Sequence, residues 1–331
     1  MDTPDKDTKN EFENRTDLSG LEKLVQDLRN EISKVIVGQE EMIDLLLVAI
    51  LADGHVLIEG NPGVAKTLTT RLLAECINTK FSRIQFTPDL MPADVVGTSV
   101  YNPKVTDFEF KKGPAFTNVL LIDEINRSPA KTQSALFEVM EERQITVDGN
   151  TYPLQEPFMV VATQNPIDHE GTYRLPEAQL DRFLFKIEVP YPDLEQEISI
   201  LEGSLNRSNR FDLSMIRKVV SADEIIKQRK AVQQVHVSAE VMKYIAEITQ
   251  NTRNSGSLSV GASPRASVYL MRASQAWAAT RGRDFVTPED VKSVVRPAFR
   301  HRIMLTPEKE MEGVSPDQVI KLILEKTEVP R

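Results

Sequence analysis

Short apolar runs alternate with segments of helical spacing over residues 55–191. Between the runs lie stretches such as TLTTRLLAECI (67–77), whose apolar positions repeat at helical spacing. Runs of strand length that alternate with helices favour a mostly parallel sheet covered by helices. We therefore predict an α/β domain here, with strands in HVLIEG (55–60), FSRIQFT (81–87), NVLLIDE (118–124), FMVVATQ (158–164) and FLFKIEV (183–189).

The two ends of the chain depart from this central pattern. Residues 1–19 are polar and predict a flexible tail, after which LEKLVQDLRNEISKVI (21–36) shows helical spacing. After Pro190-Tyr191-Pro192 the apolar runs stop and helical patterns take over. We expect an α/β domain over residues 20–191 and a helical domain over residues 192–331.

Two quartets mark helix starts in the C-terminal part. Thr287-Pro288-Glu289-Asp290 and Ser315-Pro316-Asp317-Gln318 each place a hydroxyl residue three positions before an acidic or amide residue, with proline in between. This spacing fits a capping box, or a close variant, with proline at the first helical position. Both quartets therefore predict a helix N-terminus.

Charge and cysteine content narrow the class of protein. The 331 residues carry a formal net charge of −9, which lacks the basic footprint of a nucleic-acid binder. The single cysteine, Cys76, excludes an internal disulfide and fits a reducing compartment. The first residues have no apolar leader segment, and the apolar stretch Met42–Ala52 contains Asp44 and is too short to span a bilayer. We expect a cytoplasmic protein without membrane insertion.

A candidate phosphate-binding loop, GNPGVAKT (60–67), lies between the first apolar run and the helical stretch after it. Glycines let backbone N–H groups turn inward around an anion, and the helix N-terminus adds partial positive charge. Lys66 would then reach the β- and γ-phosphates of ATP, and the Thr67 hydroxyl would coordinate Mg²⁺. The alternative is a structural Gly/Pro turn.

One position departs from the phosphate-loop pattern G-x-x-x-x-G-K-[ST]. Ala65 stands where the second glycine belongs. Alanine adds only a methyl group and suits the first helical turn, so we expect the loop to survive if Ala65 has a negative φ.

Two carboxylates and an amide follow later strands of the predicted sheet. The run 119–122 ends in Asp123 and Glu124, where Asp123 would hold the hydration shell of Mg²⁺ and Glu124 would orient or deprotonate the attacking water. Asn165 follows the next apolar run and is placed to contact the γ-phosphate or the water. The alternatives are a solvated strand end for the two acids and an Asn-Pro turn for Asn165.

With these elements in this order, the chain resembles the MoxR family of AAA+ ATPases, in the helix-2-insert branch. The resemblance rests on IVGQEEM, EGNPGVAKT, LIDEINRSPAKTQSALFEVMEE, VVATQNP, GTYRLPEAQLDRF and GASPRA. It implies a P-loop NTPase core, with a parallel sheet flanked by helices, followed by an all-α lid domain. The alanine at position 65 is usual in that family, whereas Arg174 stands where a smaller or uncharged residue is more common.

The resemblance also implies roles for individual residues. Arg182 is similar to the arginine finger that completes a neighbouring subunit's site, and Arg265 is similar to the lid arginine that contacts the γ-phosphate. The alternatives are a surface ion pair of Asp181 with Arg182 and a helix-capping role for Arg265. The implied nucleotide contacts are Val37, Gly38 and Gln39 on the adenine side, and Gly60, Asn61, Pro62, Gly63, Val64, Ala65, Lys66, Thr67 and Leu68 along the loop.

Two segments resemble the β-hairpin inserts of related rings, at about residues 99–113 and 144–154. The first is VYNPKVTDFEFKKG (100–113), and the second is QITVDGNTYPL (144–154), where Asp148-Gly149 is a turn signal. In related rings such hairpins approach the central pore and touch the substrate. Packing on one face of a hairpin explains the residues Phe108, Phe110, Lys111 and Lys112 about equally well.

Four functional hypotheses remain at this stage. The resemblance implies a hexameric ring that hydrolyses ATP with Mg²⁺ and remodels protein clients, among them von Willebrand factor A domain proteins. The second hypothesis is the motor subunit of a metal chelatase, and the third is a nucleic-acid motor, which the acidic charge disfavours. A scaffold that binds ATP without turnover is the fourth, and the paired acids Asp123 and Glu124 with Arg182 argue against it.

Overall fold

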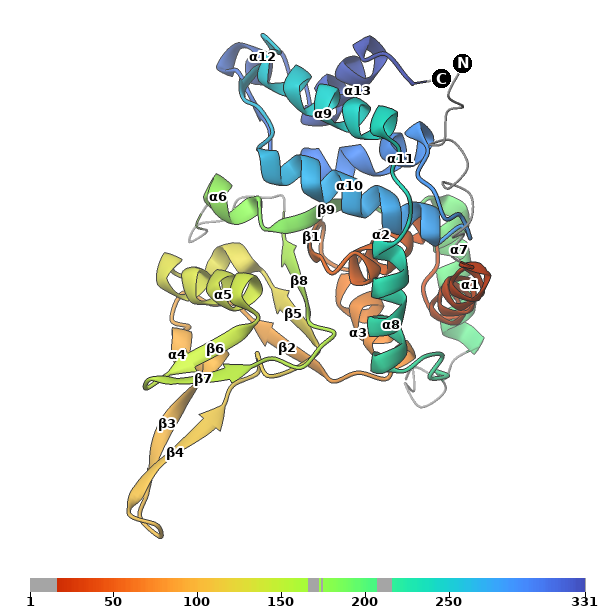
Figure 1. Ribbon diagram of the computed structural model, residues 1–331. Coiled ribbons are helices and arrows are strands. Elements are labelled where there is room, and N and C mark those ends of the chain that lie inside the picture. The colour runs from red at the N-terminus through yellow and green to blue at the C-terminus, as the bar shows by residue number, and fades with distance from the viewer. Residues whose placement is uncertain (1–16, 166–172, 174, 207–215, 331) are drawn as a thin grey trace, which may run out of the picture.

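The computed structural model describes residues 17–165, 173, 175–206 and 216–330 (Figure 1). Residues 1–16 of the expected tail (1–19) and Arg174 lie outside these ranges. Leu18 is buried and a helix begins at Ser19, so the folded part starts slightly before the expected residue 20. A five-stranded parallel sheet forms the centre, in the spatial order β2-β5-β8-β1-β9. Its strands are β1 (His55–Gly60), β2 (Phe81–Gln85), β5 (Val119–Asp123), β8 (Met159–Gln164) and β9 (Phe183–Val189).

The central strands β1, β5 and β8 are mostly apolar because both faces of the sheet are covered. Side chains alternate between the faces along each strand. In β5, Val119 and Leu121 join one hydrophobic core, whereas Leu120 and Ile122 join a second core on the opposite face. Each apolar run of the sequence therefore serves two cores, and the predicted α/β fold is confirmed.

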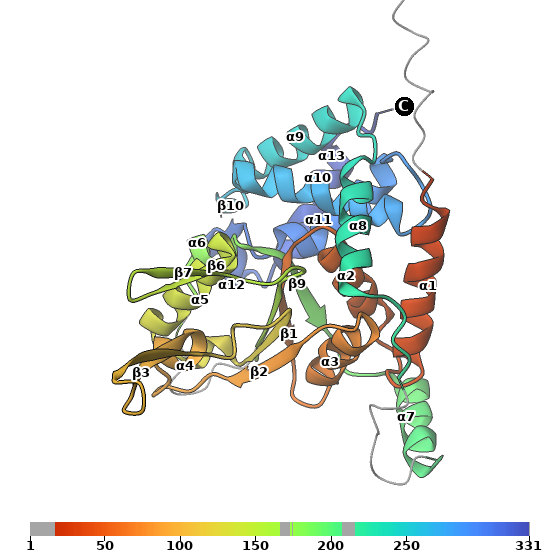
Figure 2. The same cartoon turned by 60° about the horizontal axis from the view of Figure 1, so that its bottom comes forward.

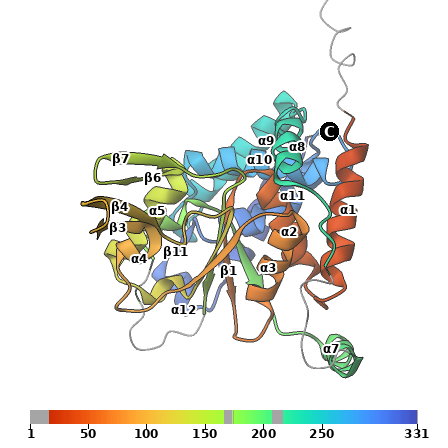
Figure 3. The same cartoon turned by 90° about the horizontal axis from the view of Figure 1, so that it is seen from below.

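Helices cover the two faces unequally (Figures 1 and 3). On one side lie α1 (Ser19–Ser33), α2 (Glu40–Leu51) and α3 (Lys66–Cys76), whose apolar side chains belong to the larger core. On the other lie α4 (Pro92–Val96) and α5 (Ala130–Glu142), which pack on the smaller core. A short 3₁₀ helix, η1 (Ile125–Arg127), directly follows β5.

Two antiparallel hairpins project from the side of the sheet that carries α5 (Figure 1). The first pairs β3 (Gly97–Asn102) with β4 (Asp107–Lys112), and the second pairs β6 (Gln144–Val147) with β7 (Asn150–Pro153). The turn of the second hairpin has positive φ at both Asp148 and Gly149, as a two-residue turn of the primed type requires.

The two hairpins contact each other through aromatic side chains. Phe110 of β4 stacks on Tyr152 of β7, with ring centroids 4.7 Å apart, and also meets Phe116 edge-on. Phe108 is 68% exposed and contacts Tyr101. Packing therefore explains Phe110, whereas Phe108 remains available at the surface.

Helices follow β9, namely α7 (Leu194–Asn206), α8 (Ala222–Gln233), α9 (Ala239–Arg253), α10 (Pro264–Ala279), α11 (Pro288–Phe299), α12 (Pro307–Met311) and α13 (Pro316–Lys326). Of these, α9, α10, α11 and α13 lie together beyond the β9 edge of the sheet, whereas α8 runs beside α2 and α7 lies by one end of α1 (Figures 1 and 2). Helix α8 packs against α2, where Arg229 Nε donates a hydrogen bond of 2.7 Å to the carbonyl oxygen of Ile50. A short strand pair, β10 (Leu258–Val260) with β11 (Met304–Leu305), was not anticipated from the sequence.

The helix starts expected from the two quartets are confirmed. Thr287 caps α11 and Ser315 caps α13, each in a capping box with proline in the first helical turn. In the described ranges, no helix is both long enough and apolar enough to cross a membrane.

A buried histidine fixes the start of β1. His55 Nε2 lies 3.1 Å from the carbonyl oxygen of Met140, and Nδ1 accepts a hydrogen bond of 3.0 Å from the backbone N–H of Val160. Burial lowers the pKa of His55 to about 3, so the ring stays neutral near neutral pH. The ring thereby ties β1 to both α5 and β8.

Candidate active site

The phosphate loop joins the carboxyl end of β1 to the first turn of α3. Gly63 and Ala65 both have positive φ, of 89° and 60°. The expectation of a negative φ at Ala65 is therefore wrong. The chain turns into α3 through a left-handed residue, which explains why the general pattern has glycine there and costs alanine about 1 kcal/mol.

Lys66 is the first residue of α3 and folds back over the loop. Its Nζ donates hydrogen bonds to the carbonyl oxygen of Gly60 and, at 3.3 Å, to that of Asn61. Burial lowers the pKa of Lys66, and nearby carboxylates, that of Asp123 foremost, act in the opposite direction. The carbonyl oxygens of the loop thus hold the ammonium group. A bound phosphate would attract it away from them.

Asp123 ends β5 and is only 7% exposed. Its Oδ1 accepts hydrogen bonds from Thr67 Oγ1 at 3.5 Å and from Thr163 Oγ1 at 3.1 Å. Its Oδ2 lies 2.6 Å from Arg83 Nε, in an ion pair from the neighbouring strand β2. Three strands and α3 therefore fix this carboxylate beside the hydroxyl of Thr67.

Glu124 follows directly, in a left-handed conformation with φ of 57°. Its Oε2 accepts hydrogen bonds from Gln85 Nε2 at 3.0 Å and from Arg127 Nη1 at 2.8 Å, and its backbone N–H bonds to Thr163. Such backbone strain in a non-glycine residue clusters at functional sites. Because of this turn, the side chains of Asp123 and Glu124 point in different directions. The hydrogen bonds from Gln85 and Arg127 then hold the Glu124 carboxylate in place.

These groups share one cavity of about 350 Å³, which Asn165 also lines. The loop supplies six of its lining residues, namely Pro62, Gly63, Ala65, Lys66, Thr67 and Leu68. Val64 instead points into the large core and is 5% exposed. The cavity combines a cation, an N-terminal helix end and two carboxylates, a set suited to a phosphate bound with a divalent metal.

The oxygens of Thr67 and Asp123 fit Mg²⁺. A hydroxyl and a carboxylate oxygen lie 3.5 Å apart, and oxygen is the ligand type that Mg²⁺ prefers. Across the described residues, no group of three or more His, Cys, Asp or Glu side chains could hold a metal by itself. Mg²⁺ that arrives with a nucleotide needs only one or two carboxylates besides phosphate and water.

A second cavity, of about 780 Å³, continues from the start of the loop toward α11. Gly60 and Asn61 line it together with Glu41 of α2 and with Lys292 and Arg296 of α11. The adenine-side candidates Val37, Gly38 and Gln39 immediately precede α2, but none of them lines this cavity or the 350 Å³ one. The side chain of Gln196 from α7 covers Gly38 so closely that a Cβ there would lie 2.3 Å from its Cδ.

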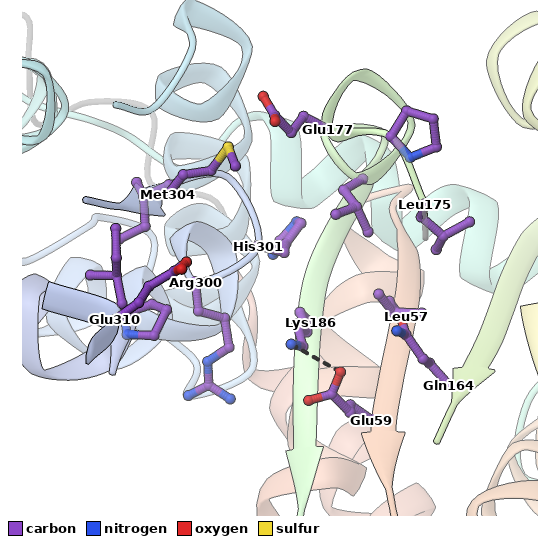
Figure 4. Close-up of a pocket in the computed structure, with 15 residues that line it drawn as sticks. Leu57, Glu59, Gln164, Leu175, Glu177, Lys186, Arg300, His301, Met304 and Glu310 are labelled. Carbon is purple, nitrogen blue, oxygen red and sulfur yellow. Dashed lines mark ion pairs between the residues drawn. The ribbon is translucent and has the colours of Figure 1, made fainter. Parts of the chain in front are cut away.

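A third cavity, of about 530 Å³, separates β1 and β9 from the C-terminal helices (Figure 4). Lys186 Nζ and Glu59 Oε2 face each other across the two strands at 3.1 Å. His301 lines the other wall, with Nε2 2.9 Å from the carbonyl oxygen of Phe183, and burial lowers its pKa well below the usual value. Gln164 lines both this cavity and the phosphate pocket.

Arg182 and Arg265 lie away from the phosphate pocket. Strand pairing aligns Phe183 with His55 and Val189 with Gly60, so Arg182 sits at the opposite end of β1 from the loop, about 20 Å away along the strand. Arg182 Nη2 pairs with Glu141 Oε2 at 2.6 Å, and Arg265 Nη2 pairs with Glu141 Oε1 at 2.9 Å. The structure therefore does not bring Arg265 to the phosphate pocket of its own chain.

Several polar residues of the pocket were missed from the sequence. Arg83 and Gln85 occupy alternate positions of β2, on the face that meets Asp123 and Glu124, and Arg127 lies one helical turn beyond Glu124. The only signal in the sequence was their polarity within or beside apolar runs. Thr163, which bonds both acids, is likewise a polar residue near the end of an apolar run.

Two parts of the chain match known domain families. Residues 55–185 match the ATPase family associated with various cellular activities (AAA), and residues 250–323 match the AAA lid domain. Thus the family match covers the phosphate loop, both acids and Arg182, whereas the lid match covers Arg265.

Whole-length relatives extend these matches. The chain is 46% identical over 299 residues to an uncharacterized protein, YeaC, of Bacillus subtilis, covering 90% of this chain and 92% of the relative. It is 42% identical to the chaperone MoxR1 of Mycobacterium tuberculosis, covering 91% and 81%. A solved structure of a proposed ATPase from Cytophaga hutchinsonii is 43% identical, with a TM-score of 0.88 over 95% of this chain and 97% of that one. The chain therefore belongs to the MoxR family of AAA+ ATPases.

Proposed function

We propose that the protein is a Mg²⁺-dependent ATPase that works as a ring and remodels protein partners. One observation carries the proposal. The loop that ends in Lys66 and Thr67 shares a single cavity with Asp123, Glu124 and Asn165, three residues that come from two other segments of the chain. A structural Gly/Pro turn would not require an acidic pair and a lysine to meet in this way.

Each group in the cavity has a separate task in phosphoryl transfer. The N–H groups of the loop and Lys66 bind the β- and γ-phosphates, and Asn165 contacts the γ-phosphate or the attacking water. Glu124, held by Gln85 and Arg127, orients that water and accepts its proton. Thr67 and Asp123 would hold Mg²⁺, which neutralises the charge on the phosphates.

The cavity of about 780 Å³ is where we place the nucleoside end of ATP. It begins at Gly60 and Asn61, so it is continuous with the loop that binds the phosphates. Lys292 and Arg296 of α11 form its far wall, which means that the bound nucleotide would touch both the sheet domain and the lid. Val37, Gly38 and Gln39 would approach the base from the start of α2.

The position of Arg182 supports a ring. If Arg182 and Arg265 act on a nucleotide, it has to be that of a neighbouring subunit, because their own loop lies at the other end of β1. Such head-to-tail contact repeats around a closed ring, for which we propose six subunits.

An exposed apolar stripe on α7 adds surface for assembly. It consists of Leu194, Ile198, Leu201 and Leu205.

We propose protein clients rather than nucleic acid. A relative at 42% identity is described as a chaperone, and the net charge of −9 disfavours a phosphate backbone. Phe108 and Lys111 at the exposed β3–β4 hairpin offer an apolar and a charged contact for such a client. Proteins with a von Willebrand factor A domain are the first partners to test, and the cytoplasm is the compartment that we propose.

Steady-state release of inorganic phosphate tests the ATPase proposal. We expect release with ATP and Mg²⁺, and loss of that release when EDTA removes the metal. Lys66→Ala should bind ATP weakly and release phosphate at background rate, because the positive charge at the β- and γ-phosphates is lost. Lys80→Ala, an exposed lysine outside the pocket, serves as the matched control. Phosphate release that is unchanged in EDTA would contradict the proposal.

A further inference from the structure

Glu141 joins two arginines that belong to different parts of the chain. Arg182 precedes β9 in the sheet domain, and Arg265 lies in the first turn of α10 in the lid. Each guanidinium binds a different oxygen of the Glu141 carboxylate, at 2.6 and 2.9 Å. Glu141 itself sits near the end of α5, the helix that follows Asp123 and Glu124.

The ion pairs with Glu141 leave part of each guanidinium available to bind another group. The ion-pair contacts of 2.6 and 2.9 Å are made by Nη2 of each arginine, and Nη1 of neither forms a hydrogen bond with a described residue. Arg182 is also fixed by the ring of Phe137, 5.7 Å from its guanidinium carbon, while its Nε is buried without a partner among the described residues. The three side chains of this contact, two positive and one negative, have a net charge of about +1.

Neighbouring acids do not share this position. Glu138 and Glu142 lie on the same part of α5 and, with Glu141 and Arg182, line another cavity of about 350 Å³, which is separate from the phosphate pocket. Neither forms an ion pair with an arginine in the described part of the chain, and both are exposed. Asp181, the other nearby acid, binds Arg302 and Ser263 instead. Among the acids that the structure describes, only Glu141 is therefore placed to hold both guanidiniums.

We propose that Glu141 is a positioning residue that holds Arg182 and Arg265 together as one phosphate-binding pair for the adjacent subunit. This inference rests on the proposed function, in which these arginines act in trans. Without Glu141, two like charges face each other and both long side chains regain their rotamer freedom. Each catalytic encounter would then have to order them again.

The same contact also links the lid to the sheet domain, so a structural role has to be separated from a positioning role. All three side chains are partly exposed, between 29% and 41%, and ion pairs of this kind contribute little to folding stability. We therefore expect Glu141→Ala to melt within a few degrees of the wild type. Its kcat should fall by about 10²-fold, the cost typical of a misplaced catalytic group, with the KM for ATP nearly unchanged.

Two further variants sharpen the measurement. Glu141→Gln keeps the size of the side chain but has one oxygen, so it can hold only one guanidinium, and its kcat should also fall. Glu142→Gln removes a neighbouring charge from the same cavity without touching either arginine, and it should keep the wild-type kcat. A wild-type kcat in Glu141→Ala would overturn the proposal.

Mixing two inactive variants tests the action in trans. Lys66→Ala has a defective phosphate loop, but its Arg182 and Arg265 are correctly held. Glu141→Ala has an intact phosphate loop, but its two arginines are no longer held together. In mixed rings some interfaces combine the two intact halves, so phosphate release should rise above the sum of the separate proteins. Arg182→Ala mixed with Lys66→Ala is the reference, because it tests the trans site without Glu141.

The outcomes separate the two proposals. Recovery in the Arg182→Ala mixture without recovery in the Glu141→Ala mixture would mean that Glu141 acts only within its own subunit, and the positioning role would be lost. Absence of recovery in both mixtures would remove the trans site itself, and the proposed ring mechanism with it.

Discussion

Glu124→Gln is expected to bind ATP normally and to release phosphate about 10²- to 10⁴-fold more slowly than the wild type. The amide can still accept the hydrogen bonds from Gln85 and Arg127 that hold the side chain, but it cannot take a proton from water. The phosphate loop and Asp123 are unchanged, so the nucleotide keeps its binding contacts. Phosphate release and equilibrium ATP binding, measured on the same preparation, check both halves of this expectation.

The control for this variant is Glu138→Gln, an exposed glutamate on α5 outside the phosphate pocket. It should keep the wild-type rate. Turnover of ATP at the wild-type rate by Glu124→Gln would show that another group activates the water, and the role assigned to Glu124 would be wrong.

Arg182→Ala should lower kcat by about 10³-fold or more, the range typical of a lost arginine finger. Its effect should fall on turnover and not on ATP binding, because Arg182 lies about 20 Å along β1 from its own loop. Kinetics and ATP titration of the same variant separate these two effects. Arg272→Ala, an exposed arginine of α10, is the matched control.

The opposite result, a change in ATP binding and not in kcat, would contradict a role of Arg182 in trans. If Arg182→Ala weakened ATP binding and left kcat intact, the arginine would have to reach the loop of its own chain. That result would contradict the strand register that separates the two, and it would remove the geometric argument for a ring.

The sequence was sufficient for the sheet because of how the sheet is buried. Both faces are covered, so β5 and β8 are nearly continuous in apolar residues, and the polar residues at their ends mark the carboxyl edge. The edge strands β2 and β9 are interrupted by polar residues. Lys66, Thr67, Asp123 and Asn165 could be assigned to one pocket on this basis. Parallel strands bring their carboxyl ends together whatever the loops between them do.

Other features depended on contacts that no local pattern records. The left-handed conformation of Ala65 depends on how the loop enters α3, and alanine itself gives no sign of it. Arg265 was expected near the γ-phosphate, yet its guanidinium shares the carboxylate of Glu141 with Arg182. Arg83 joins the pocket through an ion pair across 40 positions of sequence. The partner of each residue was set by tertiary structure.

An experimental structure of Glu124→Gln with ATP and Mg²⁺ would show directly where the nucleotide and the metal bind. We expect a triphosphate along residues 60–67, a metal ion between Thr67 and Asp123, and Arg182 of an adjacent subunit at the γ-phosphate. A nucleotide bound elsewhere, or a metal ion that Thr67 and Asp123 do not share, would contradict the proposed function.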